Sequence, residues 1–223
     1  MAIGAVRAAL ETFKDDIAVL WMDAHTDLNV PGTTPSGNMH GMPVAALLGL
    51  DPECQGPERG QWNRLLPRSP LAQDRLAYFG VRELDPGEQA HLRNLPKAYT
   101  ASMHEIDRHG IVTCMRRFDH WMRRIGVSRL WISFDVDILD PVLAPGTGTA
   151  VRGGLTYREA HLVAELISEL LAAPDCGYRL AGLDVMETNP LFDSMNETAK
   201  TVVEWIASLF GKTILGNTGR LFP

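Results

Sequence analysis

Four short apolar runs, separated by longer amphipathic segments, constrain the fold of this chain more than any other feature of its sequence. They occupy residues 17–21, 76–79, 130–134 and 180–185. Each run has the length of a typical strand and lacks the polar alternation of a strand that faces water on one side. Continuous apolar runs of this kind are typical of strands buried on both faces, so the pattern predicts a parallel sheet.

The segments between these runs have the spacing of amphipathic helices. Apolar residues recur at helical intervals in residues 111–125, 156–171 and 197–210. Thr156 and Glu159 form a capping-box pattern at the start of the second helix. Residues 51–75 are rich in proline and glycine and predict a long loop or insertion. The alternation of strands and helices predicts a single α/β domain over residues 1–223, with helices on both faces of the sheet and a tail at residues 211–223.

Composition narrows the classes of protein to which the chain can belong. Its 223 residues carry a formal net charge of −6, which argues against general affinity for nucleic acid. The three cysteines, Cys54, Cys114 and Cys176, share no CxxC spacing, so neither a disulfide framework nor a thiolate zinc site is expected. Charged residues interrupt the N-terminal segment, and no apolar run reaches the roughly 18 residues of a membrane span. We therefore expect a cytoplasmic protein that binds neither nucleic acid nor membrane.

Acidic residues follow three of the four predicted strands. Asp23 comes after the first strand, Asp135 after the third, and Asp184 with Glu187 after the fourth. The carboxyl ends of parallel strands meet at one edge of a sheet, where ligands of such folds bind. A carboxylate at the end of an apolar strand is costly to bury unless it is paired or holds a metal. We therefore expect these three strand ends to converge on a site.

Two short motifs at these strand ends have the composition of metal ligands. On an extended chain Asp23, His25 and Asp27 point to one side, and so do Asp135 and Asp137. Carboxylates with one imidazole suit a hard or borderline divalent ion such as manganese or iron, and carboxylates can bridge two ions. Each motif alone is also compatible with a turn, a helix cap or hydrogen-bonded loop residues. Their occurrence together, each after a buried strand, favours a metal site.

Several longer stretches resemble the sequence motifs of the arginase (ureohydrolase) family. Residues 23–43 are similar to the arginase signature, residues 133–141 to the second metal motif, residues 146–159 to the segment after that motif, and residues 182–190 to the closing motif. The resemblance implies a three-layer α/β/α fold around a mainly parallel sheet. It also implies a binuclear manganese centre whose ligands are Asp23, His25, Asp27, Asp135 and Asp137, with Asp23 and Asp135 bridging the two ions.

The same resemblance implies a reaction and the residues that perform it. In the family, a metal-bound hydroxide attacks the guanidinium carbon of L-arginine, which yields L-ornithine and urea. Glu187 matches the guanidinium-binding carboxylate, His40 the proton-shuttle histidine, and Asp27 a carboxylate that accepts a hydrogen bond from the hydroxide. Thr149 matches a position that supports the surroundings of Glu187. Taken singly, each has an ordinary alternative: a surface or helix-capping glutamate, a loop histidine, or a turn hydroxyl.

The resemblance also implies which groups hold the far end of the substrate. Asn29, Thr34 and Ser36 lie in a loop of the arginase form, where polar groups hold the α-carboxylate. Asp85 and Glu88 match positions that recognise the α-amino group, and an acidic pair suits an ammonium. The same Asp-Pro-Gly-Glu pattern is by itself the start of a helix.

One family motif has no counterpart in this sequence. Family members carry Gly-Gly-Asp-His-Ser just ahead of the segment equivalent to residues 2–6, and its histidine is a metal ligand. None of the seven histidines lies in a matching place. We therefore expect an N-terminally truncated arginase-like fold, from a misplaced start codon or as a genuine short form. In this fold the second manganese ion is weakly bound or absent.

Two alternatives to hydrolysis of L-arginine stay open at this point. The chain can act on another guanidino compound, or it can be an impaired or inactive arginase-like protein that binds partners. The resemblance further implies a homo-oligomer, because Arg158 and Glu159 lie in a motif near subunit contacts in the family.

Overall fold

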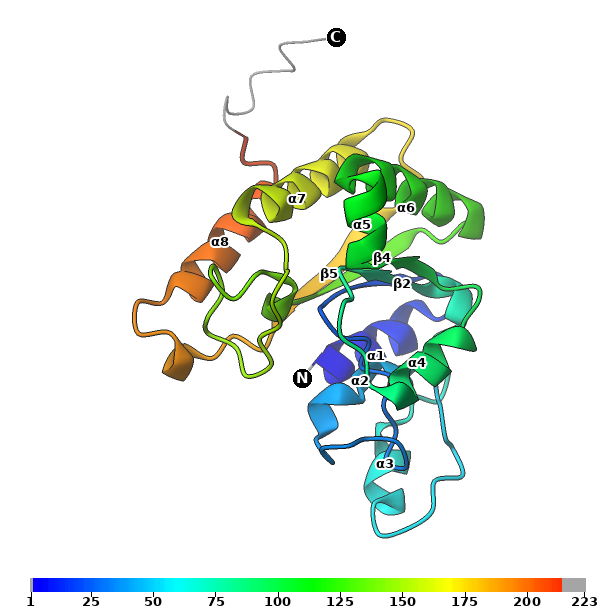
Figure 1. Cartoon of the computed structure of the whole chain (residues 1–223). Coiled ribbons are helices and arrows are strands. Elements are labelled where there is room, and N and C mark those ends of the chain that lie inside the picture. Colours follow the sequence, from blue (N-terminus) through cyan, green and yellow to red (C-terminus); the bar gives the residue numbers. More distant parts are fainter. Residues whose placement is uncertain (1, 214–223) are drawn as a thin grey trace.

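The computed structural model, which describes residues 2–213, is built around a five-stranded sheet. All neighbouring strands are parallel, and their order is β3-β2-β1-β4-β5. The strands are β1 (Ala18–Met22), β2 (Leu76–Phe79), β3 (Tyr99–Ala101), β4 (Arg129–Asp135) and β5 (Arg179–Met186). Figure 1 shows helices on both faces of this sheet, which is the expected three-layer α/β/α arrangement.

The helices of the first part of the chain pack on one face of the sheet and the later helices on the other. The first group is α1 (Ala2–Phe13), α2 (Pro43–Leu47), α3 (Arg59–Leu65) and α4 (Pro86–Arg93). The second group is α5 (Met103–His109), α6 (Ile111–Ile125), α7 (Tyr157–Ala172) and α8 (Glu197–Leu209). Along β1, Val19 and Trp21 belong to the core under the first group, whereas Leu20 and Met22 belong to the core under the second. Burial on both faces is why the strands are continuous apolar runs.

The predicted strands and the three predicted helices are confirmed, with boundaries that differ by one residue at most. The capping box of α7 is also present. The Thr156 hydroxyl accepts the N–H of Glu159, and the Glu159 carboxylate accepts the N–H of Thr156. This reciprocal pair satisfies two donors that the first turn of the helix cannot satisfy itself.

The prediction of a long loop over residues 51–75 is wrong in part. The segment contains α3 and a 3₁₀ turn at Gln73–Arg75. Trp62 on α3 is buried, and its Nε1–H donates to two backbone carbonyl groups. The helix is short enough to fit between Pro57 and Pro67, so these prolines bound the helix and do not interrupt it.

Five of the elements, β3, α1, α2, α3 and α5, are not predicted from the sequence. Most of them are short: β3 has three residues, α2 five and α5 seven. Segments of that length carry too few residues for hydrophobic periodicity to identify them. In the part of the chain from residue 2 to residue 213, no helix combines the length and apolar character needed to cross a bilayer. Residues 214–223 of the predicted tail lie outside the described residues.

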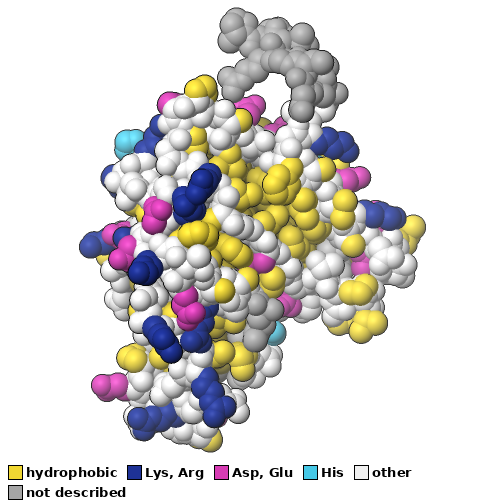
Figure 2. Space-filling view, turned by 180° about the vertical axis from the view of Figure 1, so that it is seen from behind, with side chains coloured by type: hydrophobic (Ala, Val, Ile, Leu, Met, Phe, Trp, Pro, Cys, Tyr) yellow, Lys and Arg dark blue, Asp and Glu magenta, His cyan; other side chains and the backbone are white. Residues whose placement is uncertain are grey.

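The strand β5 forms one edge of the sheet. Its residues from Leu180 to Met186 are half-buried, whereas every residue of β1 and β2 is buried. Seen from behind in Figure 2, hydrophobic side chains gather over the middle of the molecule. The exposed apolar side chains of Val203 and Phe210 on and after α8 add to the hydrophobic surface.

Candidate metal centre and active site

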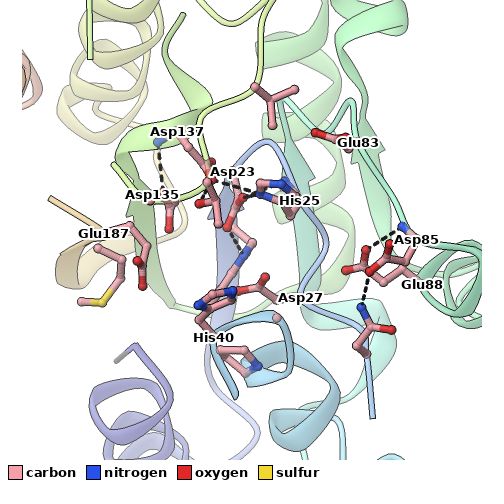
Figure 3. Close-up of a pocket in the computed structure, with 18 of the residues that line it drawn as sticks. Asp23, His25, Asp27, His40, Glu83, Asp85, Glu88, Asp135, Asp137 and Glu187 are labelled. Carbon is pink, nitrogen blue, oxygen red and sulfur yellow. Dashed lines mark hydrogen bonds and ion pairs between the residues drawn. The ribbon is translucent and has the colours of Figure 1, made fainter. Parts of the chain in front are cut away.

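A pocket of about 420 Å³ lies at the carboxyl ends of β1 and β4. All the site residues proposed from the sequence line it. They are Asp23, His25, Asp27, Asn29, Thr34, Ser36, His40, Asp85, Glu88, Asp135, Asp137, Thr149 and Glu187. Figure 3 labels nine of these residues around a common space, with Glu187 on one side of the acidic cluster and Asp85 with Glu88 on the other.

Asp23, His25 and Asp137 form the centre of this pocket. Their potential ligand atoms all lie within 4.8 Å of one another. The Nδ1 atom of His25 is 3.0 Å from Asp137 Oδ2 and 3.3 Å from Asp23 Oδ1. Asp137 Oδ1 also accepts the N–H of Ala24, which joins the two motifs through the backbone. The motifs meet because β1 and β4 are paired neighbours in the sheet.

Asp27 and Asp135, the other two expected ligands, line the same pocket outside this close group. Asp135 ends β4, and its Oδ1 accepts the N–H of Asp137 at 3.0 Å. Asp27 has a φ of 53° and Glu187 a φ of 59°, in the left-handed region that residues other than glycine seldom adopt. Strained backbone of this kind concentrates at functional sites, and both residues carry a carboxylate into the pocket.

The buried carboxylates of the cluster repel one another, and burial makes their negative charge costly. Burial raises the pKa of Asp23 to about 7, and the neighbouring Asp137 carboxylate adds to the rise. Burial and the charge of Asp23 also raise the pKa values of Asp27 and Asp135 well above the ordinary value. Burial alone would lower the pKa of His25, but its contacts with Asp137 and Asp23 outweigh burial and raise that pKa to about 11. One imidazolium does not balance four carboxylates.

This donor set fits a divalent metal ion. Carboxylate oxygens with one imidazole nitrogen are the ligands of hard and borderline ions, and a bound cation would offset the charge that burial makes costly. Neighbouring donors orient the carboxylates. Trp21 Nε1–H donates to Asp23 Oδ2 at 3.0 Å, and the Thr149 hydroxyl donates to Asp137 Oδ2 at 2.9 Å. Outer contacts of this type fix the direction in which a ligand points.

The far side of the pocket is built around the start of α4. Asp85 and Glu88 form its capping box, as their sequence pattern predicts. Glu88 is buried, and its carboxylate accepts the N–H groups of Asp85 and Leu28 and the hydroxyl of Thr26. Asp85 accepts from the Asn29 side chain at 2.9 Å. Asp85 thus lies at the pocket wall, where Asn29 fixes its carboxylate and Glu88 fixes its backbone N–H.

Three residues line the more open part of the pocket. Thr34 is half-buried and Ser36 is exposed, and each side-chain oxygen accepts an N–H from within its own loop. His40 is exposed and lies in the 3₁₀ turn Met39–Gly41, next to Asp27 in Figure 3.

The expected convergence of strand ends is wrong for one residue. Asp184 is not at a strand end, because β5 continues to Met186. Its carboxylate accepts from Trp131 Nε1–H and from the Ser133 hydroxyl, and Asp184 does not line the pocket. Glu187, which follows β5 directly, does line it.

Sequence reasoning missed Arg82, which ties the pocket loops together. Its guanidinium donates to the carbonyl oxygens of Asp137 at 2.6 Å, Val151 at 2.8 Å and Arg152 at 3.2 Å. These acceptors lie between 55 and 70 positions away in the chain, so no local sequence pattern predicts the contact. Glu83, the next residue, lines the pocket and was also missed.

Known proteins share both the sequence motifs and the fold of this chain. The sequence model of the Arginase family matches residues 1–211. The chain is 35% identical to an arginase of Staphylococcus aureus (strain COL), over 96% of this chain and 66% of that protein. It is 40% identical to an arginase of Schizosaccharomyces pombe, over 98% of this chain and 62% of that protein. The crystal structure of arginase from Bacillus caldovelox superposes with a TM-score of 0.81 and 36% identity, covering 96% of this chain and 66% of that one.

The chain thus spans about two thirds of the length of these relatives. The family match extends over both metal motifs, the segment of Asp85 and Glu88, and Glu187. The sequence identity and the shared fold agree with that match. The chain belongs to the arginase family.

Proposed function

We propose that this chain hydrolyses L-arginine to L-ornithine and urea with the help of manganese. The proposal rests on one pocket that combines an acidic metal-ligand cluster with the carboxylate of Glu187. Within residues 2–213, no side chain forms a hydrogen bond or ion pair with that carboxylate. A guanidinium is planar and cationic and offers paired donors, so an unpaired carboxylate matches it. Membership of the arginase family supports the same reaction.

The residues that would hold manganese are Asp23, His25, Asp27, Asp135 and Asp137. A divalent ion bound there supplies an activated water at neutral pH, since it lowers the pKa of water toward about 7. Asp23, His25 and Asp137 are close enough to share one ion, so we propose that this group is filled first. Asp27 and Asp135 would complete the coordination or serve a second ion.

The two ends of the substrate would meet two acidic sides of the pocket. We propose that the guanidinium faces Glu187 and that the α-ammonium faces Asp85, across the cluster from it. Glu88 would act mainly by holding Asp85 and by its charge, because its oxygens already accept three hydrogen bonds. Asn29, Thr34 and Ser36 would contribute polar groups near the α-carboxylate.

Two residues would handle protons. Asp27 would accept a hydrogen bond from the attacking water and so orient its lone pair toward the guanidinium carbon. His40 lies beside Asp27 at the exposed side of the pocket. An imidazole there can take a proton from solvent and give it to the departing amine, because it has both a donor and an acceptor nitrogen.

Urea release is the direct test. The purified chain, loaded with manganese, is assayed with L-arginine, with agmatine, which lacks the α-carboxylate, and with 4-guanidinobutyrate, which lacks the α-amino group. We expect L-arginine to be the best substrate. Glu187→Gln should abolish most urea release while bound manganese, measured by elemental analysis, is retained. Glu53→Gln, at an exposed glutamate away from the pocket, is the matched control and should behave like the wild type.

Four outcomes separate the alternatives. Preference for agmatine would replace L-arginine as the substrate and would contradict the assignment of Asn29, Thr34 and Ser36 to the α-carboxylate. Preference for 4-guanidinobutyrate would likewise replace L-arginine and would contradict the assignment of Asp85 to the α-ammonium. No urea from any of the three, with folded protein and bound manganese, would favour an inactive arginase-like protein. No bound manganese in folded protein would remove the metal-centre proposal itself.

A further inference from the structure

A second groove, of about 790 Å³, lies at the opposite end of the strands from the acidic pocket. Its walls come from three segments: the residues just before β2, the residues around the start of β3, and the C-terminal half of α6. Ligands of open α/β sheets that take part in catalysis bind at the carboxyl ends of strands. A groove at the amino ends is therefore independent of the proposed reaction.

The groove is basic although the protein as a whole is acidic. Five basic side chains line it, against the single acidic side chain of Asp74: Arg75, Lys97, Arg117, His120 and Arg124. The whole chain, by contrast, has a net charge of −6. Concentrated positive charge on an acidic protein raises the local concentration of anions.

Two of the four arginine and lysine side chains of the groove have no acidic partner within residues 2–213. Arg75 pairs with Asp15 at 2.7 Å, and Arg117 approaches Glu105 at 3.8 Å. Lys97 and Arg124 are exposed, and within residues 2–213 neither forms an ion pair or a side-chain hydrogen bond. Their donors are free for a ligand.

Trp121, which also lines the groove, provides an independent observation. Its side chain is 3% exposed, and its Nε1–H has no hydrogen-bond partner among residues 2–213. The indole N–H groups of the other four tryptophans all donate a hydrogen bond. Trp21 and Trp131 donate to the carboxylates of Asp23 and Asp184. Trp62 and Trp205 donate to backbone carbonyl oxygens. Buried donors are rarely left unsatisfied, so this exception sets the wall of the basic groove apart from the other tryptophan sites.

We propose that this groove binds a phosphate-bearing small molecule. Lys97 and Arg124 would hold the phosphate oxygens through charge-assisted hydrogen bonds, and the guanidinium of Arg124 matches phosphate in a bidentate fashion. Arg75 and Arg117 would add charge at the walls. Trp121 packs in the wall of the groove, so a bound phosphate would change the electrostatic surroundings of its indole. Several cations around one space favour a multiply charged phosphate over a single carboxylate.

Titration with inorganic pyrophosphate tests the proposal. The metal-free protein is used, since pyrophosphate also binds manganese. Heat of binding is measured by calorimetry, and the five indole N–H signals are followed by NMR, with the Trp121 signal assigned through Trp121→Phe. We expect saturable binding, with the Trp121 signal shifting and the other four staying in place. The double variant Lys97→Ala/Arg124→Ala should bind at least about tenfold more weakly, because charge-assisted hydrogen bonds are lost.

The matched control removes two positive charges from a surface outside the groove. Arg59→Ala/Arg68→Ala alters two exposed arginines of the segment around α3 and should bind pyrophosphate like the wild type. Equal weakening in the two double variants would show general charge attraction and overturn the proposal. The absence of heat and of a Trp121 shift in wild-type protein well above about 1 mM pyrophosphate would overturn it as well. The wild-type NMR result decides the matter even if a variant folds poorly.

Discussion

The acidic pocket and the basic groove lie at opposite ends of the sheet, and their charges differ in sign and in burial. At the carboxyl ends, Asp23 and Asp137 are buried on short segments that follow the strands directly. At the amino ends, Lys97 and Arg124 are exposed on long side chains. Burying like charges together is costly, whereas exposed charges cost little. A bound cation would therefore stabilise the acidic pocket, whereas the basic groove is stable without a ligand.

We expect the largest effect from a substitution in the acidic pocket that leaves the basic groove unchanged. Asp137→Asn keeps the shape of the side chain but removes a charge from the group formed with Asp23 and His25. We expect urea release to fall on the order of 10⁴-fold, as for loss of a central catalytic group. Manganese affinity, measured by titration, should fall with it. Pyrophosphate binding at the amino ends should be unchanged. Near-normal manganese binding in this variant would refute the assignment of the three-residue group.

The free energy of unfolding of the metal-free protein should depend on pH because of the acidic pocket and not because of the basic groove. Asp23 titrates near 7 in the folded protein and near 3.8 when unfolded, so the folded state binds the extra proton between these values. Its contribution to stability is therefore lost as pH rises from about 4 to about 7. His25, with its pKa raised to about 11 from 6.5, adds a further loss as pH rises above neutrality.

We expect the free energy of unfolding of the metal-free protein to fall by roughly 3 kcal/mol between pH 4 and pH 7.5, measured by urea denaturation. Manganese at pH 7.5 should restore it, because the ion binds only the folded state. Stability that rises over this range without metal would contradict the charge excess at the acidic end. The variant Lys97→Ala/Arg124→Ala should show the same pH profile as the wild type.

Arg82 provides a test of how the acidic end is held together. Arg82→Met removes the guanidinium that binds the carbonyl oxygens of Asp137, Val151 and Arg152, and it leaves these acceptors unsatisfied. We expect a loss of roughly 2 kcal/mol of stability, measured by denaturation. We also expect a 10- to 100-fold loss of manganese affinity, in the range for an outer contact of a metal site. Equal manganese affinity in Arg82→Met and wild type would restrict Arg82 to a purely structural role.

We expect the smallest effect from a substitution outside both the acidic pocket and the basic groove. Thr156→Ala removes the side-chain cap of α7 and should cost about 1 kcal/mol of stability. Neither manganese nor pyrophosphate affinity should change, because Thr156 lines neither the pocket nor the groove. A change in either affinity would mean that loss of stability alone perturbs ligand binding. The larger effects of the other variants would then need correction for it.

Much of the acidic end could be predicted because its information is local. The motif around Asp23, His25 and Asp27 is continuous in the chain, and it follows a strand whose apolar run is plain. The capping boxes of α4 and α7 were likewise predictable, since each uses residues three positions apart. The basic groove had no such signal. Its residues come from three separate segments, and each alone reads as an ordinary charged surface position.

By itself, the sequence determined where four of the strands and the longest amphipathic helices lie, which residues could bind a metal, and which family the motifs resemble. These properties depend on the periodicity of side chains along the backbone and on the chemistry of short motifs. Only the tertiary structure decided that β1 and β4 are neighbours, that Asp184 stays outside the pocket, and that Arg82 reaches the backbone of the second metal motif. The same is true of the unpaired cations beside Trp121. Strand order and packing join residues far apart in the chain, and no local pattern encodes those distances.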